Sequence, residues 1–171
     1  VDRGVFPGAT SNHHLFSLPA MLVATLEVET FGATYARDVV ANAQAFARAL
    51  AKRGLPPAFE ASGFTQSHQV AVDVSAHGGG REVATLIAGQ DVICNMNLLP
   101  GEPGKNAMNP KGLRLGVQEL TRYGMGPAEM DEAARLLVDA VVHRKDVASD
   151  VARLRARFPT VKYAFAASDL R

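Results

Sequence analysis

Strand-like segments crowd the middle of the chain, and their spacing constrains the fold more than any other feature. Residues 69–74 (QVAVDV) and 112–117 (GLRLGV) alternate in hydropathy, 91–95 (DVICN) is a short apolar run, and 59–64 is a weaker strand candidate. A parallel pairing needs a crossover of a dozen or more residues, usually a helix. These segments lie too close together for repeated crossovers of that kind. The sequence therefore predicts an α/β fold with a small, mainly antiparallel sheet of three or four strands.

Helical periodicity surrounds these segments. Apolar residues recur at three- and four-residue spacing over 13–30, 33–53, 81–89, 127–144 and 146–157. Gly32 separates the first two predicted helices, and Pro19 either kinks the first helix or marks its true first turn. We expect a helical arm over 1–55, which begins with a loop over 1–12, followed by a small α/β domain over 56–171 with helices against one face of the sheet.

Composition narrows the classes of function. With 18 basic and 17 acidic side chains the net charge is +1, which gives no field suited to nucleic acid or to an anionic membrane. No apolar stretch approaches the ~20 residues of a membrane span. The single cysteine, Cys94, lies in an apolar run, so we expect a buried, inert thiol in a reducing compartment and a cytoplasmic protein.

Two other patterns suggest binding sites that the residues do not support. His13 and His14 are adjacent, so on a helix they point about 100° apart and cannot share a metal as an i, i+4 pair does. We therefore predict no metal site. The glycines at 78–80 lack the spacing and the lysine of a phosphate-binding loop, which favours a flexible turn.

Arg114 is the strongest candidate for a binding residue. It alternates with Leu113 and Leu115, so it lies on the opposite face of the strand from them, and Gly112 and Gly116 leave room around it. The planar donor fork of arginine fits the two oxygens of a carboxylate. Spacing alone, however, favours a surface or ion-paired strand arginine over a binding residue.

Four segments, in this order, resemble the C-terminal portion of the serine hydroxymethyltransferase (glycine hydroxymethyltransferase) family. They are VFPGATSNHHLFSLPAM, GFTQSHQVAVDV, DVICNMNLLPGE and NPKGLRLGVQELTRYGM, and the resemblance runs from about residue 3 to residue 142. The motifs SNHH and QELTRYGM are similar to those of archaeal-type members. The resemblance implies a homodimeric fold-type-I enzyme with pyridoxal 5'-phosphate. Such enzymes transfer the hydroxymethyl carbon of serine to tetrahydrofolate or a related pterin and leave glycine.

The resemblance also assigns site residues. It implies that Arg114 holds the amino-acid carboxylate, that Asn97 contacts the pterin, and that Phe6 approaches the pterin from the partner subunit. The family's paired glycines, which contact the cofactor phosphate across the dimer, map to Ser11 and Asn12. This is a departure from the family pattern, although backbone amides and the new side chains can both donate hydrogen bonds there.

The family's Schiff-base lysine lies in a histidine–lysine segment upstream of VFPG, and this chain has no such segment. Covalent catalysis with pyridoxal phosphate requires that amine. We therefore predict no catalytic residue in the chain, expect the chain alone to be inactive, and interpret it as a segment of a longer enzyme. A second departure is Tyr123, where many members carry arginine.

Two alternatives remain. A related β-hydroxy amino acid aldolase or transaldolase would use Arg114 equally, because its substrates share the amino-acid carboxylate; Asn97 and Phe6 favour a pterin acceptor. A non-catalytic α/β interaction module would keep the core but would have no use for Arg114 in an open cleft.

Overall fold

The computed structural model describes residues 2–9, 14–166 and 168–169. The chain divides into two compact units. The first comprises Val1–Ala33 with Tyr163–Arg171, and the second comprises Thr34–Lys162. The boundary between them falls inside helix α1 (Ser17–Lys52). The predicted division of the protein at residue 55 stays a prediction.

In the described part of the first unit, no apolar side chain is fully buried. The ring of Phe31 packs against Phe165 with 5.5 Å between centroids, and the Phe165 N–H donates to the carboxylate of Glu27. The predicted loop over 1–12 is wrong in its described part, because Gly4–Ala9 forms a π-helical turn. Glycine permits that turn, since a Cβ on Gly8 would lie 2.8 Å from the Arg3 carbonyl oxygen.

Helix α1 is one continuous helix, and the predicted break at Gly32 is wrong. An isolated glycine costs about 1 kcal/mol relative to alanine inside a helix. That cost is small beside the burial of the apolar stripe further along α1, which includes Phe46 and Leu50. Pro19 lies in the first turn, where its missing N–H has no helical acceptor to lose.

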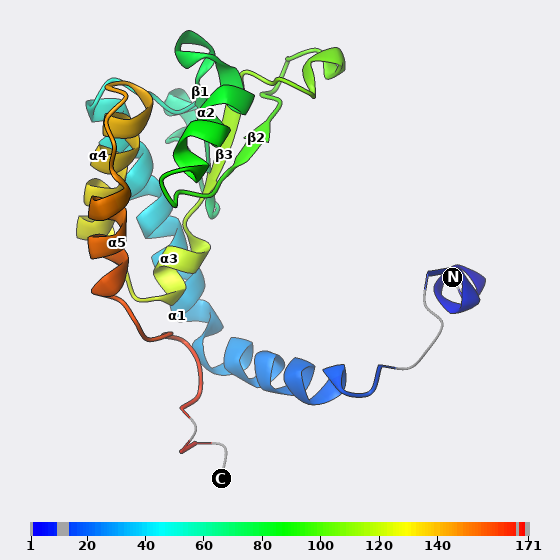
Figure 1. The fold of residues 1–171 in the computed structure, drawn as a ribbon. Helices are drawn as coiled ribbons and strands as arrows, with labels where there is room; N and C mark the ends of the chain where they lie inside the picture. The colour runs from blue at the N-terminus through cyan, green and yellow to red at the C-terminus, as the bar shows by residue number, and fades with distance from the viewer. Residues whose placement is uncertain (1, 10–13, 167, 170–171) are drawn as a thin grey trace. The chain divides into compact units, whose positions relative to one another are not determined.

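The second unit is built on a three-stranded sheet with the strand order β1-β3-β2. Strands β1 (Gln69–Asp73) and β2 (Asn95–Asn97) both pair antiparallel with the central strand β3 (Gly112–Gly116). The predicted antiparallel sheet is therefore confirmed (Figure 1). In the register, Ala71 and Asn95 both lie opposite Arg114, so these three residues share one face of the sheet.

The core lies on the other face of the sheet. Val70, Val72, Leu113 and Leu115 are buried there and form one hydrophobic cluster with buried residues of the helices. Besides α1, these helices are α2 (Gly79–Ala88), α4 (Pro127–Val141) and α5 (Ala148–Ala156). Their ends agree with the predicted ends to within three residues. In the described part of the chain, no helix is long and apolar enough to cross a membrane.

Two strand predictions are wrong. The second strand begins only at Asn95, because the residues before it close helix α2: the Val92 N–H donates to the Ile87 carbonyl, and Asp91 adopts a left-handed conformation with φ 61°. The weaker candidate over 59–64 is a 3-10 turn, Glu60–Ser62. The sequence pattern also missed the short helix α3 (Gln118–Arg122).

A buried side chain, Asn42, fixes α1 to the segment that follows β3. Its Nδ2 donates to the Thr121 hydroxyl and to the Met125 carbonyl, each at 2.9 Å. The Thr121 hydroxyl in turn donates to the Val117 carbonyl at 2.8 Å. With only 2% of Asn42 exposed, this polar network is enclosed, and each of its bonds is made away from competing water.

Candidate functional site

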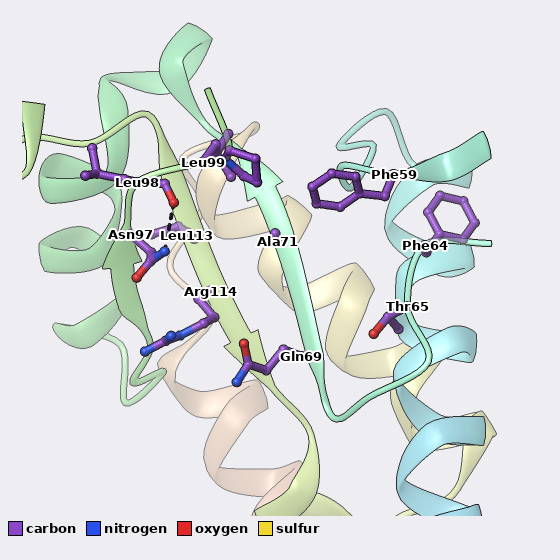
Figure 2. Close-up of a pocket in the computed structure, with 11 residues that line it drawn as sticks. Phe59, Phe64, Thr65, Gln69, Ala71, Asn97, Leu98, Leu99, Leu113 and Arg114 are labelled. Atoms are coloured by element: carbon purple, nitrogen blue, oxygen red, sulfur yellow. Dashed lines mark hydrogen bonds between the residues drawn. The ribbon is translucent and has the colours of Figure 1, made fainter. Parts of the chain in front are cut away.

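A pocket of about 430 Å³ opens on the sheet face opposite the core. Figure 2 shows that it lies between the strands and the turn that precedes β1. Its polar lining side chains are Thr65, Gln69, Asn97 and Arg114. Aromatic rings, leucines, Ala71 and Pro100 form the rest of the wall, so the pocket combines hydrogen-bond donors with apolar surface, as small-molecule sites do.

Arg114 lies on this pocket because of strand alternation. Its neighbours Leu113 and Leu115 are buried in the core, whereas Arg114 is exposed on the opposite face, as the alternating pattern predicted. The residue opposite it on β1 is the small Ala71, and Figure 2 shows the Arg114 side chain extending away from β1. Within 2–9, 14–166 and 168–169, no side chain or carbonyl hydrogen-bonds or pairs with this guanidinium. Its donors are therefore available to a ligand.

Asn97 lies on the same pocket, at the end of β2, so the structure brings together two of the predicted binding residues. Its Nδ2 donates to the Leu98 carbonyl at 2.8 Å (Figure 2), which fixes the orientation of the amide. The opposite residue must be glycine, because a Cβ on Gly112 would lie 2.7 Å from the Asn97 carbonyl oxygen and 2.6 Å from Leu99 Cδ2.

The remaining predicted binding residues are placed differently. Phe6 belongs to the first unit, in the Gly4–Ala9 turn, and 61% of it is exposed. Ser11 and Asn12 fall outside the described residues. The roles of all three stay predictions.

Sequence reasoning missed other residues of the pocket. Gln69 could have been found, because it lies two positions before Ala71 in the alternating strand and so shares the face of Arg114. Its Nε2 lies 2.9 Å from Nε2 of His68. Phe59 and Phe64 gave no signal, since both adopt left-handed conformations (φ 67° and 68°) that are unfavourable for aromatic residues and that local sequence does not predict.

Among the described residues, neither the cysteine thiol nor the side chains that can ligate metals form a reactive site. Burial raises the pKa of the Cys94 thiol to about 11, so the thiol is protonated at neutral pH and is a poor nucleophile. Within the part of the chain that the structure describes, no three histidine, cysteine or carboxylate side chains cluster as metal ligands do.

Comparison with solved structures identifies the class of fold. The chain superimposes on L-threonine transaldolase from Pseudomonas fluorescens, solved in its internal aldimine state, with a TM-score of 0.83 and 31% sequence identity. The match covers 94% of this chain and 37% of the transaldolase. It confirms the predicted fold class, the C-terminal part of a fold-type-I transferase.

Sequence comparison identifies the family. The family model described as serine hydroxymethyltransferase matches residues 1–137. Serine hydroxymethyltransferases of Methanopyrus kandleri and Saccharolobus islandicus share 47% and 46% sequence identity with this chain. Each alignment covers 96% of the chain. The chain therefore belongs to the serine hydroxymethyltransferase family, as its motifs indicated. It spans 39% of the length of these two relatives.

Proposed function

We propose that this chain is the C-terminal part of a pyridoxal-phosphate-dependent serine hydroxymethyltransferase and that it supplies the binding site for the carboxylate of the amino-acid substrate. The observation that carries the proposal concerns the Arg114 guanidinium. It lines the pocket and has no hydrogen-bond or ion-pair partner among the described residues. A guanidinium binds a carboxylate through two parallel, charge-assisted hydrogen bonds.

The donors of the pocket fit an amino acid. The lining residues carry one cation, no anion and the neutral amides of Gln69 and Asn97, so an anionic group is attracted without a competing carboxylate. When bound, pyridoxal phosphate supplies the electron sink for cleavage of the serine side-chain bond. Arg114 would fix the orientation of the substrate during that cleavage. Ser11 and Asn12 would contact the cofactor phosphate.

The apolar part of the pocket fits the second substrate. Asn97 would hydrogen-bond the tetrahydrofolate-type pterin, with Leu98 and Leu99 as apolar wall beside it. Phe6 would contact the pterin bound in the partner subunit of a homodimer. We place the complete enzyme in the cytoplasm, in glycine and serine one-carbon metabolism, and we expect this chain alone to be inactive.

The second candidate function is transfer or cleavage of another β-hydroxy amino acid. The structural similarity to L-threonine transaldolase favours it, and Arg114 would serve both reactions. The two functions differ in the acceptor. A non-catalytic module is a weaker candidate, because it leaves an uncovered arginine in a pocket unexplained.

Steady-state assays of an enzyme of full family length that carries this chain distinguish these functions. We expect glycine to form from serine only when tetrahydrofolate is present, at a higher kcat/KM than for aldehyde release from threonine. The Arg114→Gln variant should lose kcat/KM for both substrates, whereas Arg48→Gln, at an exposed arginine outside the pocket, should match the wild type. Threonine turnover without pterin dependence would favour the second candidate, and no turnover of either would contradict both.

A further inference from the structure

A 14-residue loop, 98–111, connects β2 to β3 and carries part of the pocket. Leu98, Leu99 and Pro100 at its beginning line the pocket directly after Asn97; residues 97–100 are called the pocket wall below. The loop contains no strand pairing and only one 3-10 turn, Gly104–Asn106. Its shape must therefore come from other contacts.

The carboxylate of Glu102 provides those contacts. Its Oε2 accepts from the Leu99 N–H at 3.2 Å, and its Oε1 accepts from the Lys111 N–H at 3.0 Å and from Asn106 Nδ2 at 3.2 Å. The Glu102 N–H returns a bond to the Leu99 carbonyl at 2.9 Å. One side chain thus joins the beginning, the middle and the end of the loop.

The charge state of Glu102 matches this role. Partial burial opposes ionisation, but the hydrogen bonds from Leu99, Asn106 and Lys111, together with the Lys111 charge, outweigh it and lower the pKa of the carboxyl. When ionised, the carboxylate has acceptor oxygens and no donor, which suits three converging donors.

The C-terminal end of the loop, residues 110–111, contacts helix α2, whereas Leu99 in the pocket wall has no such hydrogen bond to a helix among the described residues. The Gly80 N–H of α2 donates to the Pro110 carbonyl at 2.7 Å, and a Cβ on Gly80 would lie 2.6 Å from the Gly112 carbonyl oxygen. Residues 110–112 are therefore held against α2 by the backbone. Past Asn97, where pairing with β3 ends, the Leu99 backbone is held from inside the loop, by Glu102.

We propose that Glu102 is a positioning residue for ligand binding, which holds the pocket wall in place by tying Leu99 to the anchored end of the loop at Lys111. The inference rests on the proposed function, because it assigns the wall to the pterin. Arg114 lies within β3 and is held by strand pairing on both sides. Loss of the Glu102 contacts should therefore weaken pterin binding and leave carboxylate binding intact.

The test is a comparison of Michaelis constants in an enzyme of full family length. Glu102→Gln keeps the shape but replaces one acceptor oxygen with an NH2 group that faces donors. We expect the KM for tetrahydrofolate to rise about tenfold, as misplacement of a binding group does, with the KM for serine and kcat within about twofold of wild type. Glu102→Asp keeps the charge on a shorter side chain, so its KM for tetrahydrofolate should lie between those of the wild type and Glu102→Gln. Glu119→Gln, at an exposed carboxylate of α3, is the matched control and should have no effect.

Amide hydrogen exchange in the 171-residue chain provides a second measurement that does not depend on activity. Glu102→Gln should accelerate exchange at Leu99 and leave exchange at Leu113, within β3, as in the wild type. A wild-type enzyme without tetrahydrofolate-dependent activity would contradict the proposed function alone, and exchange would still decide whether Glu102 holds the wall. Unchanged exchange at Leu99, or an active Glu102→Gln enzyme with unchanged KM for tetrahydrofolate, would overturn the inference.

Discussion

Replacing Asn42 with alanine should destabilise the second unit by about 3–4 kcal/mol. The substitution removes two buried hydrogen bonds, to the Thr121 hydroxyl and the Met125 carbonyl, each worth about 1 kcal/mol. It also leaves the Met125 carbonyl without this donor, which costs about 1–2 kcal/mol more in an enclosed site. The Thr121 hydroxyl keeps its bond to Val117, so it adds little to the cost.

Thermal unfolding followed by circular dichroism measures this effect. For a chain of this size the expected loss corresponds to a fall in Tm of about 6–16 °C. Gln44→Ala is the control on the same helix, because Gln44 is only half-buried and donates a single bond, to the Thr65 carbonyl. It should lower the free energy of unfolding by about 1 kcal/mol or less. Equal losses for the two variants would refute the argument that enclosure of the Asn42 network makes it stabilising.

Two further predictions concern acid and self-association. Arg53 donates two hydrogen bonds to Asp131, and these bonds lower the pKa of the Asp131 carboxyl. The ion pair therefore stabilises the fold above the unfolded-state pKa, near about 4, and this stabilisation is lost as pH falls through the folded-state pKa. The urea midpoint should therefore fall less between pH 5 and pH 3 for Asp131→Asn than for the wild type, and equal falls would contradict this. The first unit exposes large apolar side chains such as Leu15 and Phe16, the latter 80% exposed, so sedimentation should show concentration-dependent association of the isolated chain that Phe16→Ser weakens. A strictly monomeric wild type would refute that prediction.

Alternation and spacing predicted the parts of the fold that depend on local pattern. The spacing of the strand segments was enough to predict an antiparallel sheet, and the alternation of 112–117 placed Arg114 opposite its leucine neighbours. The same alternation contained the signal for Gln69. The chemical role of each residue could not be read from these patterns, and it came from the resemblance to a family.

The errors lie where tertiary contacts decide local structure. Helix α1 continues through Gly32 because its apolar stripe is buried further along, which a local glycine signal does not reveal. Strand β2 is set by pairing of Asn95–Asn97 with β3, although the more apolar residues precede it. The conformations of Phe59 and Phe64 follow from the turn between them, and Glu102 was not predicted because its three donors are dispersed over 99–111.

The most direct test of the account is a serine titration of the Arg114→Lys variant in an enzyme of full family length. Lysine keeps the charge but loses the fork that binds both carboxylate oxygens. Loss of one hydrogen bond to a charged group, worth about 1.5–3 kcal/mol, should raise the Kd for serine by about 10- to 100-fold. The Tm without ligand should stay at the wild-type value, because no described residue bonds to the guanidinium. A wild-type Kd for serine, or a large fall in Tm without ligand, would show that Arg114 serves the fold and would contradict the proposed site.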